Sequence, residues 1–157
     1  MVLIKPLFAA LMLAALASSV AVAALAGAGT PKRNACGLLT RAEISTAMKE
    51  PVSSTKGGRS PTGGLFCNWV GKDAGLFPKG ISLIVATSNP KDLYAASGAL
   101  LEKRKPVPGV GVAAVTDGNV ILARSSRAMV QVGATYVNSG IALATIRGLV
   151  KKVLART

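Results

Sequence analysis

The chain has 157 residues, with 19 lysines and arginines, six aspartates and glutamates and no histidine, which makes its formal net charge +13. This length predicts one domain with one ordinary core. The absence of histidine excludes nucleophilic systems built on a histidine base and excludes imidazole ligands for a metal. The basic excess favours an anionic partner, and the alternative is a basic exported protein without a specific anionic ligand.

The N-terminal segment has the pattern of an export signal. Lys5 is the only charge before Lys32, and the residues between them are apolar or small. We therefore predict a signal peptide at residues 1–28, followed by a flexible leader at 29–35. A retained membrane anchor is the alternative, because the uncharged run exceeds the roughly 20 residues that a span needs. We expect cleavage, and no stable membrane span after it.

The folded domain is predicted at residues 36–157, and it contains both cysteines of the chain, Cys36 and Cys67. The charges of Lys32 and Arg33 are unsuited to lipid acylation of Cys36. In the oxidising compartment that export implies, two cysteines most simply form one disulfide. A loop of about 30 residues makes such a bridge worth roughly 3–4 kcal/mol.

The first predicted helix begins after Thr40. Glu43 stands three residues further on, which is the pattern of a capping box, and Leu39 and Ile44 occupy the positions of a hydrophobic staple. The following proline, Pro51, ends the helix by about residue 49. Residues 53–64 are rich in Ser, Thr, Gly and Pro, so we predict a solvated connecting loop, with a basic recognition loop as the alternative.

Two strands are predicted next, at residues 66–70 and 81–87. Cys67 and Trp69 are two residues apart and therefore share one face of the first strand. We expect Trp69 to pack in the core beside the disulfide, and stacking on a ligand is the alternative.

A second helix is predicted from Pro90, with Asn89 as its cap and Leu100 in its inward stripe. The end of this helix is predicted to carry Lys103, Arg104 and Lys105, which are favourable near the negative helix terminus.

Three further strands are predicted at 112–116, 119–125 and 128–135, the first two joined by a tight turn at Asp117-Gly118. A last helix is predicted to start near Asn138 or Ser139. Its apolar stripe would cover the sheet, and the alternative is that it lies on a membrane. The basic residues largely off that stripe are Arg147, Lys151, Lys152 and Arg156.

Together these elements predict the α+β fold class. The domain would be a single antiparallel sheet of about five strands with helices packed on it, in the order α-β-β-α-β-β-β-α.

Several motifs resemble an uncharacterised family of small exported bacterial proteins, many of them lipoproteins of actinobacteria. The motifs are Asn-Ala-Cys-Gly-Leu-Leu-Thr at 34–40, Lys-Glu-Pro-Val at 49–52, Cys67-x-Trp69 and Val-Pro-Gly-Val-Gly at 107–111. The resemblance implies an exported α+β domain with a bridge between the two cysteines, and it implies no established activity. The chain lacks the lipobox of the lipid-anchored members.

The carboxylates do not form a suggestive catalytic pair. Glu50 and Asp73 are those without a capping, turn or exposed-helix explanation, so a hydrolase is the remote alternative. We therefore predict that the protein is not an enzyme and needs no cofactor or metal.

The function predicted from the sequence is that of an exported, periplasmic or secreted, binding or structural module of the cell envelope, with an envelope protein as partner. The alternative is a binder of anionic lipid or wall polymer. Nucleic acid is disfavoured by export and by the scarcity of aromatic residues. The candidate anionic contacts are Lys103, Arg104, Lys105, Arg147, Lys151, Lys152 and Arg156.

Overall fold

The computed structural model describes residues 34–60, 63–72, 78–135 and 140–157. The predicted signal peptide at 1–28 and residues 29–33 of the predicted leader lie outside these ranges. Within them the chain forms a 3-10 turn, three α-helices and seven strands. In chain order they are η1 (Ala35–Leu38), α1 (Arg41–Met48), β1 (Val52–Arg59), β2 (Leu65–Gly71), β3 (Gly80–Ala86), α2 (Pro90–Ala99), β4 (Lys105–Pro106), β5 (Ala113–Thr116), β6 (Val120–Arg124), β7 (Met129–Ala134) and α3 (Leu143–Arg156).

All seven strands belong to one antiparallel sheet with the order β1-β2-β3-β7-β6-β5-β4. The sheet therefore consists of two meanders, which meet where β3 pairs with β7. The α+β class and the antiparallel sheet are confirmed, and the predicted number of about five strands is too low. The two additional strands are β1 and the short β4, which form its edges.

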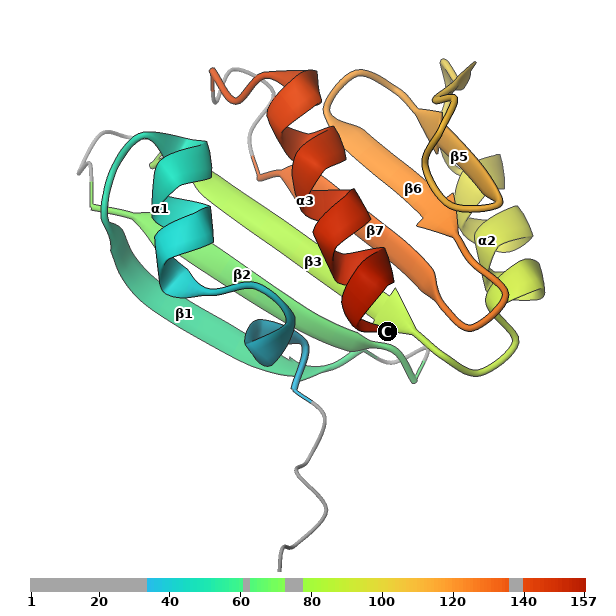
Figure 1. Cartoon of the computed structure of the whole chain (residues 1–157), viewed down its shortest axis with the longest axis horizontal. Coiled ribbons are helices and arrows are strands. Elements are labelled where there is room, and N and C mark those ends of the chain that lie inside the picture. Colours follow the sequence, from blue (N-terminus) through green and yellow to red (C-terminus); the bar gives the residue numbers. More distant parts are fainter. Residues whose placement is uncertain (1–33, 61–62, 73–77, 136–139) are drawn as a thin grey trace, which may run out of the picture.

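The helices lie on both faces of the sheet (Figure 1). In this view η1, α1 and α3 lie in front of the sheet, and α2 lies behind it at the β5–β6 side. Successive residues of β6 explain this layering, because their side chains point to opposite faces. Ile121 and Ala123 join the core under α3, while Leu122 packs with residues of α2.

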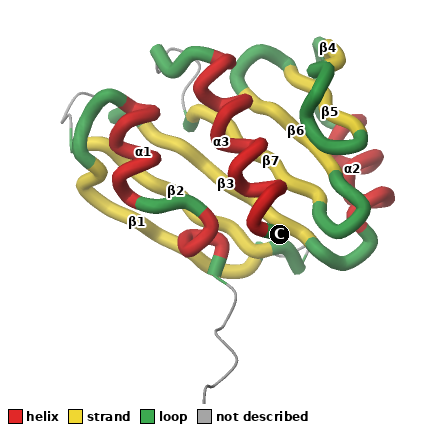
Figure 2. Tube along the Cα trace, viewed as in Figure 1, coloured by secondary structure: helices red, strands yellow, loops and turns green. Residues whose placement is uncertain are grey.

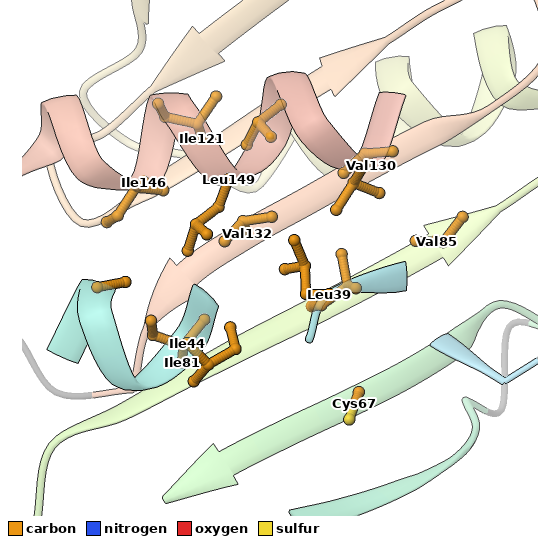
Figure 3. Packing of buried hydrophobic residues seen from close by; sticks show 14 of the residues in the cluster. Leu39, Ile44, Cys67, Ile81, Val85, Ile121, Val130, Val132, Ile146 and Leu149 are labelled. Carbon is orange, nitrogen blue, oxygen red and sulfur yellow. The ribbon is translucent and has the colours of Figure 1, made fainter. Parts of the chain in front are cut away.

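The main core fills the space between the sheet and α1 and α3 (Figure 3). Ile44 from α1, Ile146 and Leu149 from α3, and Leu39 before α1 all point into it. Trp69 is 2 % exposed and belongs to the same core, as predicted. Burying large apolar side chains of this kind stabilises the fold by about 1.5–3 kcal/mol each.

The N-terminus of α1 has the predicted capping box. The Glu43 N–H donates to Thr40 Oγ1 at 3.2 Å, and the Thr40 N–H donates to Glu43 Oε2 at 2.9 Å. Leu39 and Ile44, the predicted staple pair, are both buried. Lys49 ends the helix in a left-handed conformation with φ of 58°.

The segment predicted as a loop at 53–64 is a strand for most of its length. β1 runs from Val52 to Arg59 and pairs with β2, with one shift of register between Val52 and Ser54. All its residues after Val52 are exposed, so it has no apolar alternation to reveal it. Its strand conformation comes from the backbone ladder with β2.

The second helix differs from its prediction in three details. Asn89 precedes α2, but its φ is 47° and its side chain makes no capping hydrogen bond. Leu100 follows the helix and is 83 % exposed, instead of lying in an inward stripe. Because the helix ends at Ala99, the cluster from Lys103 to Lys105 lies beyond its last turn.

Three of the four strands of the second meander, β5, β6 and β7, lie where strands were predicted. Asp117 and Gly118 form the turn between β5 and β6, with Gly118 at a φ of 109°. The Asp117 carboxylate accepts hydrogen bonds from the Asn119 and Val120 N–H groups, which explains this acid as a turn residue.

The last helix starts later than predicted. The predicted starts, Asn138 and Ser139, lie outside the described residues, and α3 begins at Leu143 after an extended Ala142. Its buried residues recur at helical spacing and cover β6 and β7. None of the helices in the described ranges is long and apolar enough to cross a membrane.

The predicted disulfide between Cys36 and Cys67 is present, with the two Cα atoms 5.0 Å apart. It joins η1 to β2, the strand next to the β1 edge of the sheet. Figure 2 shows η1 as a short helical turn beside this part of the sheet. Ala35 is fully buried and Asn34 caps η1, so the folded part includes two residues that the sequence assigned to the leader. Such a bridge is compatible with an oxidising compartment.

Candidate functional site

A groove of about 1010 Å³ lies at one end of the sheet. The residues that line it come from η1, from β1 and its turn to β2, from the end of β3, from the start of α2 and from the end of α3. Figure 1 shows where these elements lie. We call it the sheet-end groove, and none of the described residues that line it is acidic. The described residues that line the sheet-end groove are Asn34, Gly37, Leu38, 57–59, 63–65, 85–88, Leu93, Arg156 and Thr157.

The disulfide fixes one wall of the sheet-end groove. The Asn34 side chain accepts a hydrogen bond from the Cys36 N–H at 3.0 Å, which starts η1 beside β1. Gly57 lies directly under this turn. A Cβ atom there would meet Cys36 Sγ at 2.7 Å and Asn34 Oδ1 at 2.9 Å. This close approach of η1 to the sheet therefore requires glycine at position 57.

The end of α3 forms a second wall, held by ion pairs. Arg156 donates to both carboxylate oxygens of Glu43 at 2.9 Å and to the Leu38 carbonyl at 2.7 Å. Lys152 Nζ lies 2.9 Å from Glu43 Oε1. Hydrogen bonds from Arg156, Thr40 and Lys152 hold the pKa of this carboxyl well below its usual range. Two of the predicted anionic contacts are thus already paired with an acid of the same chain.

The turn between β1 and β2 provides a third wall and an exposed cation. Arg59 is exposed, and its Nη1 donates to the Gly63 carbonyl at 3.3 Å. On the opposite face, the ring of Phe66 covers Gly58, with ring carbons within 3.0 Å of where a Cβ would lie. Sequence reasoning missed Arg59 because the surrounding residues read as a loop. A basic recognition loop was the alternative to the solvated connecting loop predicted at 53–64.

The remaining predicted basic residues lie away from the groove. Arg147 belongs to another side of α3, where its Nη2 donates to the Pro108 carbonyl at 2.6 Å. Lys151 is exposed. The cluster of Lys103, Arg104 and Lys105 is exposed near β4 and α2. Since α2 and α3 cover opposite faces, the seven predicted contacts do not form one surface.

The acids of the described ranges show no catalytic arrangement. Glu50 has a buried Oε1 without a hydrogen-bond partner, and its Oε2 lies 4.0 Å from Lys79 Nζ. Asp73, the other carboxylate considered for a hydrolase, lies outside the described residues. Among the residues that are described, no cluster of three acidic or cysteine side chains could hold a metal ion.

A smaller hollow of about 200 Å³ lies beside α2. Ile84, Leu93 and Met129 contribute apolar side chains to it, and its lining includes no charged residue. This hollow can contact an apolar group, but the described residues that line it include no charged side chain that could take part in catalysis.

Comparison with known proteins gives no relative, since no family model, curated protein or solved structure matches this chain. The resemblance of its motifs to small exported bacterial proteins therefore stays a prediction. The fold and the groove define an α+β domain, cross-linked by one disulfide, with a groove at the end of its sheet.

Proposed function

We propose that the protein is a non-catalytic binding module of the cell envelope and that the sheet-end groove holds an anionic group of its ligand. Arg59 is the observation that carries this proposal. Its guanidinium is exposed at the groove, and within the described part of the chain it makes only a long hydrogen bond to a carbonyl and faces no acid of the lining. A carboxylate or phosphate would complete its hydrogen bonding.

Two observations support a binding role over a catalytic one. The cysteines are joined in a disulfide, so neither is a free nucleophile. The ionised Glu43 is committed to its cap and to two cations, which leaves it no role as an acid or base. The disulfide is compatible with the oxidising compartment in which an exported module would lie.

The test is binding of an acidic peptide followed by fluorescence anisotropy. The probe is a labelled peptide of alternating glutamate and threonine, about ten residues long. We expect binding at low salt that weakens at about 150 mM salt. Because one exposed ion pair contributes up to about 1 kcal/mol, Arg59→Gln should weaken binding about fivefold.

The matched control is Lys103→Gln, which removes an exposed charge remote from the groove. This variant should bind the acidic peptide as the unchanged protein does. Absence of binding at low salt would refute the proposal. Equal weakening by the two substitutions would also refute it, because it would show binding to net charge rather than to the groove.

A second candidate function is binding of anionic lipid or wall polymer. It is favoured by the exposure of Lys103, Arg104, Lys105 and Lys151, which make no ion pair within the described residues. Co-sedimentation with acidic vesicles, for the unchanged protein and for a variant with these four residues changed to glutamine, tests it. Loss of binding in the variant alone would support this candidate.

A further inference from the structure

The two edges of the sheet differ in length and chemistry. β4 forms one edge with only Lys105 and Pro106, and a proline has no N–H to offer. β1 forms the other edge with eight residues, and all of them after Val52 are exposed. A long exposed edge strand can accept a strand from another chain.

The backbone of β1 is oriented for such pairing. The Ser60 N–H donates to the Gly64 carbonyl on the β2 side at 2.7 Å. Backbone groups of an antiparallel strand alternate between its two sides, and the register along 54–59 is unbroken. Alternate residues of this stretch therefore direct their N–H and C=O groups away from β2. These residues are Thr55, Gly57 and Arg59.

The open part of the edge begins after the first residues of β1. Arg41 donates to the Val52 and Ser53 carbonyls, and the register shifts at this point. Residues 54–59 lie beyond that contact and are exposed, and Gly57 and Gly58 add no side chain of their own to the edge. The stretch ends at Arg59, in the sheet-end groove.

We infer that an extended acidic segment of a partner protein adds to the sheet along residues 54–59, an inference that rests on the proposed function. Lys56 and Arg59 are exposed on β1, which carries no acid. A second copy of this chain would bring the same cations to the new strand pair, and like charges oppose such pairing. A segment with carboxylates instead places opposite charges across the new strand pair.

The experiment compares three peptides on the purified protein. The first is the alternating glutamate–threonine peptide. The second is the same peptide with methyl groups on the backbone nitrogens of two adjacent central residues, so that one methyl group lies on each edge of the added strand. The third has glutamine for glutamate. Losing strand pairing at the centre removes hydrogen bonds of about 1 kcal/mol each, so we expect the methylated peptide to bind roughly tenfold more weakly. The glutamine peptide should bind more weakly as well.

The outcomes separate this inference from the proposed function. Equal binding of the methylated and parent peptides would overturn strand addition and leave an anionic site in the groove. Binding of the glutamine peptide as tight as the parent would overturn the acidic partner. If no peptide binds while acidic vesicles do, both the inference and the groove proposal are wrong.

Hydrogen exchange gives a readout on the protein itself. On binding of the parent peptide, the amides of Thr55, Gly57 and Arg59 should exchange at least about tenfold more slowly. The amide of Ser126, exposed in the β6–β7 turn, is the control and should not change. Unchanged exchange at the three β1 amides under saturating peptide would overturn the inference.

Discussion

Glu43 joins the start of one helix to the end of another. It closes the capping box of α1 and accepts hydrogen bonds from Lys152 and Arg156 of α3. Because both helices lie on the same face of the sheet, this carboxylate holds the last turn of α3 beside η1. The wall of the sheet-end groove therefore depends on one acid.

Replacing Glu43 by glutamine should lower the free energy of unfolding by roughly 1 kcal/mol near pH 7. The pKa of Glu43 in the folded protein lies below the value of about 4.3 in the unfolded chain. Its stabilising contribution is therefore present above that pH and is lost as the pH falls further. Urea denaturation should show the difference between the two proteins shrinking toward about pH 3.

The control for that series is Glu102→Gln, at an exposed residue between α2 and β4. It should change neither the stability nor its dependence on pH. A Glu43→Gln protein as stable as the unchanged protein at neutral pH would contradict the account of this ion-paired wall.

Gly57 is the glycine on which the approach of η1 to the sheet depends. Gly57→Ala should destabilise the protein by about 1–3 kcal/mol, because the new methyl group would overlap the disulfide sulfur. Gly148→Ala is the matched control, since its Cβ meets nothing within 4 Å in the middle of α3. That change should stabilise the helix by about 0.5–1 kcal/mol. Thermal unfolding of both variants checks the contrast, and equal effects would contradict it.

Residues with local explanations could be predicted from the sequence. The capping pair Thr40 and Glu43 needed only their spacing, and the burial of Trp69 followed from its place in a short apolar strand. The pairing of Glu43 with Arg156 could not be predicted, because it joins residues 113 positions apart. Such contacts exist only after the sheet has placed both helices on one face.

At the scale of elements, β1 shows why an edge strand is hard to predict. Its exposed sequence, rich in Ser, Thr and Gly, has the composition of a loop. The residues that make it a strand lie in β2, where Phe66 covers Gly58 and the backbone supplies a ladder. The groove and the open edge were missed for the same reason. The interior strands β3, β6 and β7, which carry their own apolar pattern, were predicted.

The disulfide cross-links η1 to the meander of β1, β2 and β3. We therefore expect its removal to destabilise this part of the fold first. A protein with Cys36 and Cys67 both changed to alanine should lose roughly 3–4 kcal/mol of stability, since the bridge closes a loop across 31 positions. Chemical denaturation with and without a reductant checks this value. Identical stability of the oxidised and reduced forms of the unchanged protein would contradict it.

At the scale of the whole molecule, the positive charge is spread over separate surfaces. The seven candidate anionic contacts fall into two clusters: Lys103–Lys105 follow α2, and the other four lie on α3, which covers the opposite face of the sheet. Net charge alone therefore says little about where a ligand binds. The sheet-end groove is distinguished by its shape and by an exposed arginine, with no acid among the lining residues that the structure describes.

A nuclear magnetic resonance titration with the acidic peptide tests the central proposal, binding at the sheet-end groove, most directly. We predict that the amide signals of 57–59 and of Gly63 and Gly64 shift most, with a midpoint that moves to higher peptide concentration as salt increases. Shifts centred on Lys103–Lys105, or spread evenly over all exposed lysines and arginines, would contradict it.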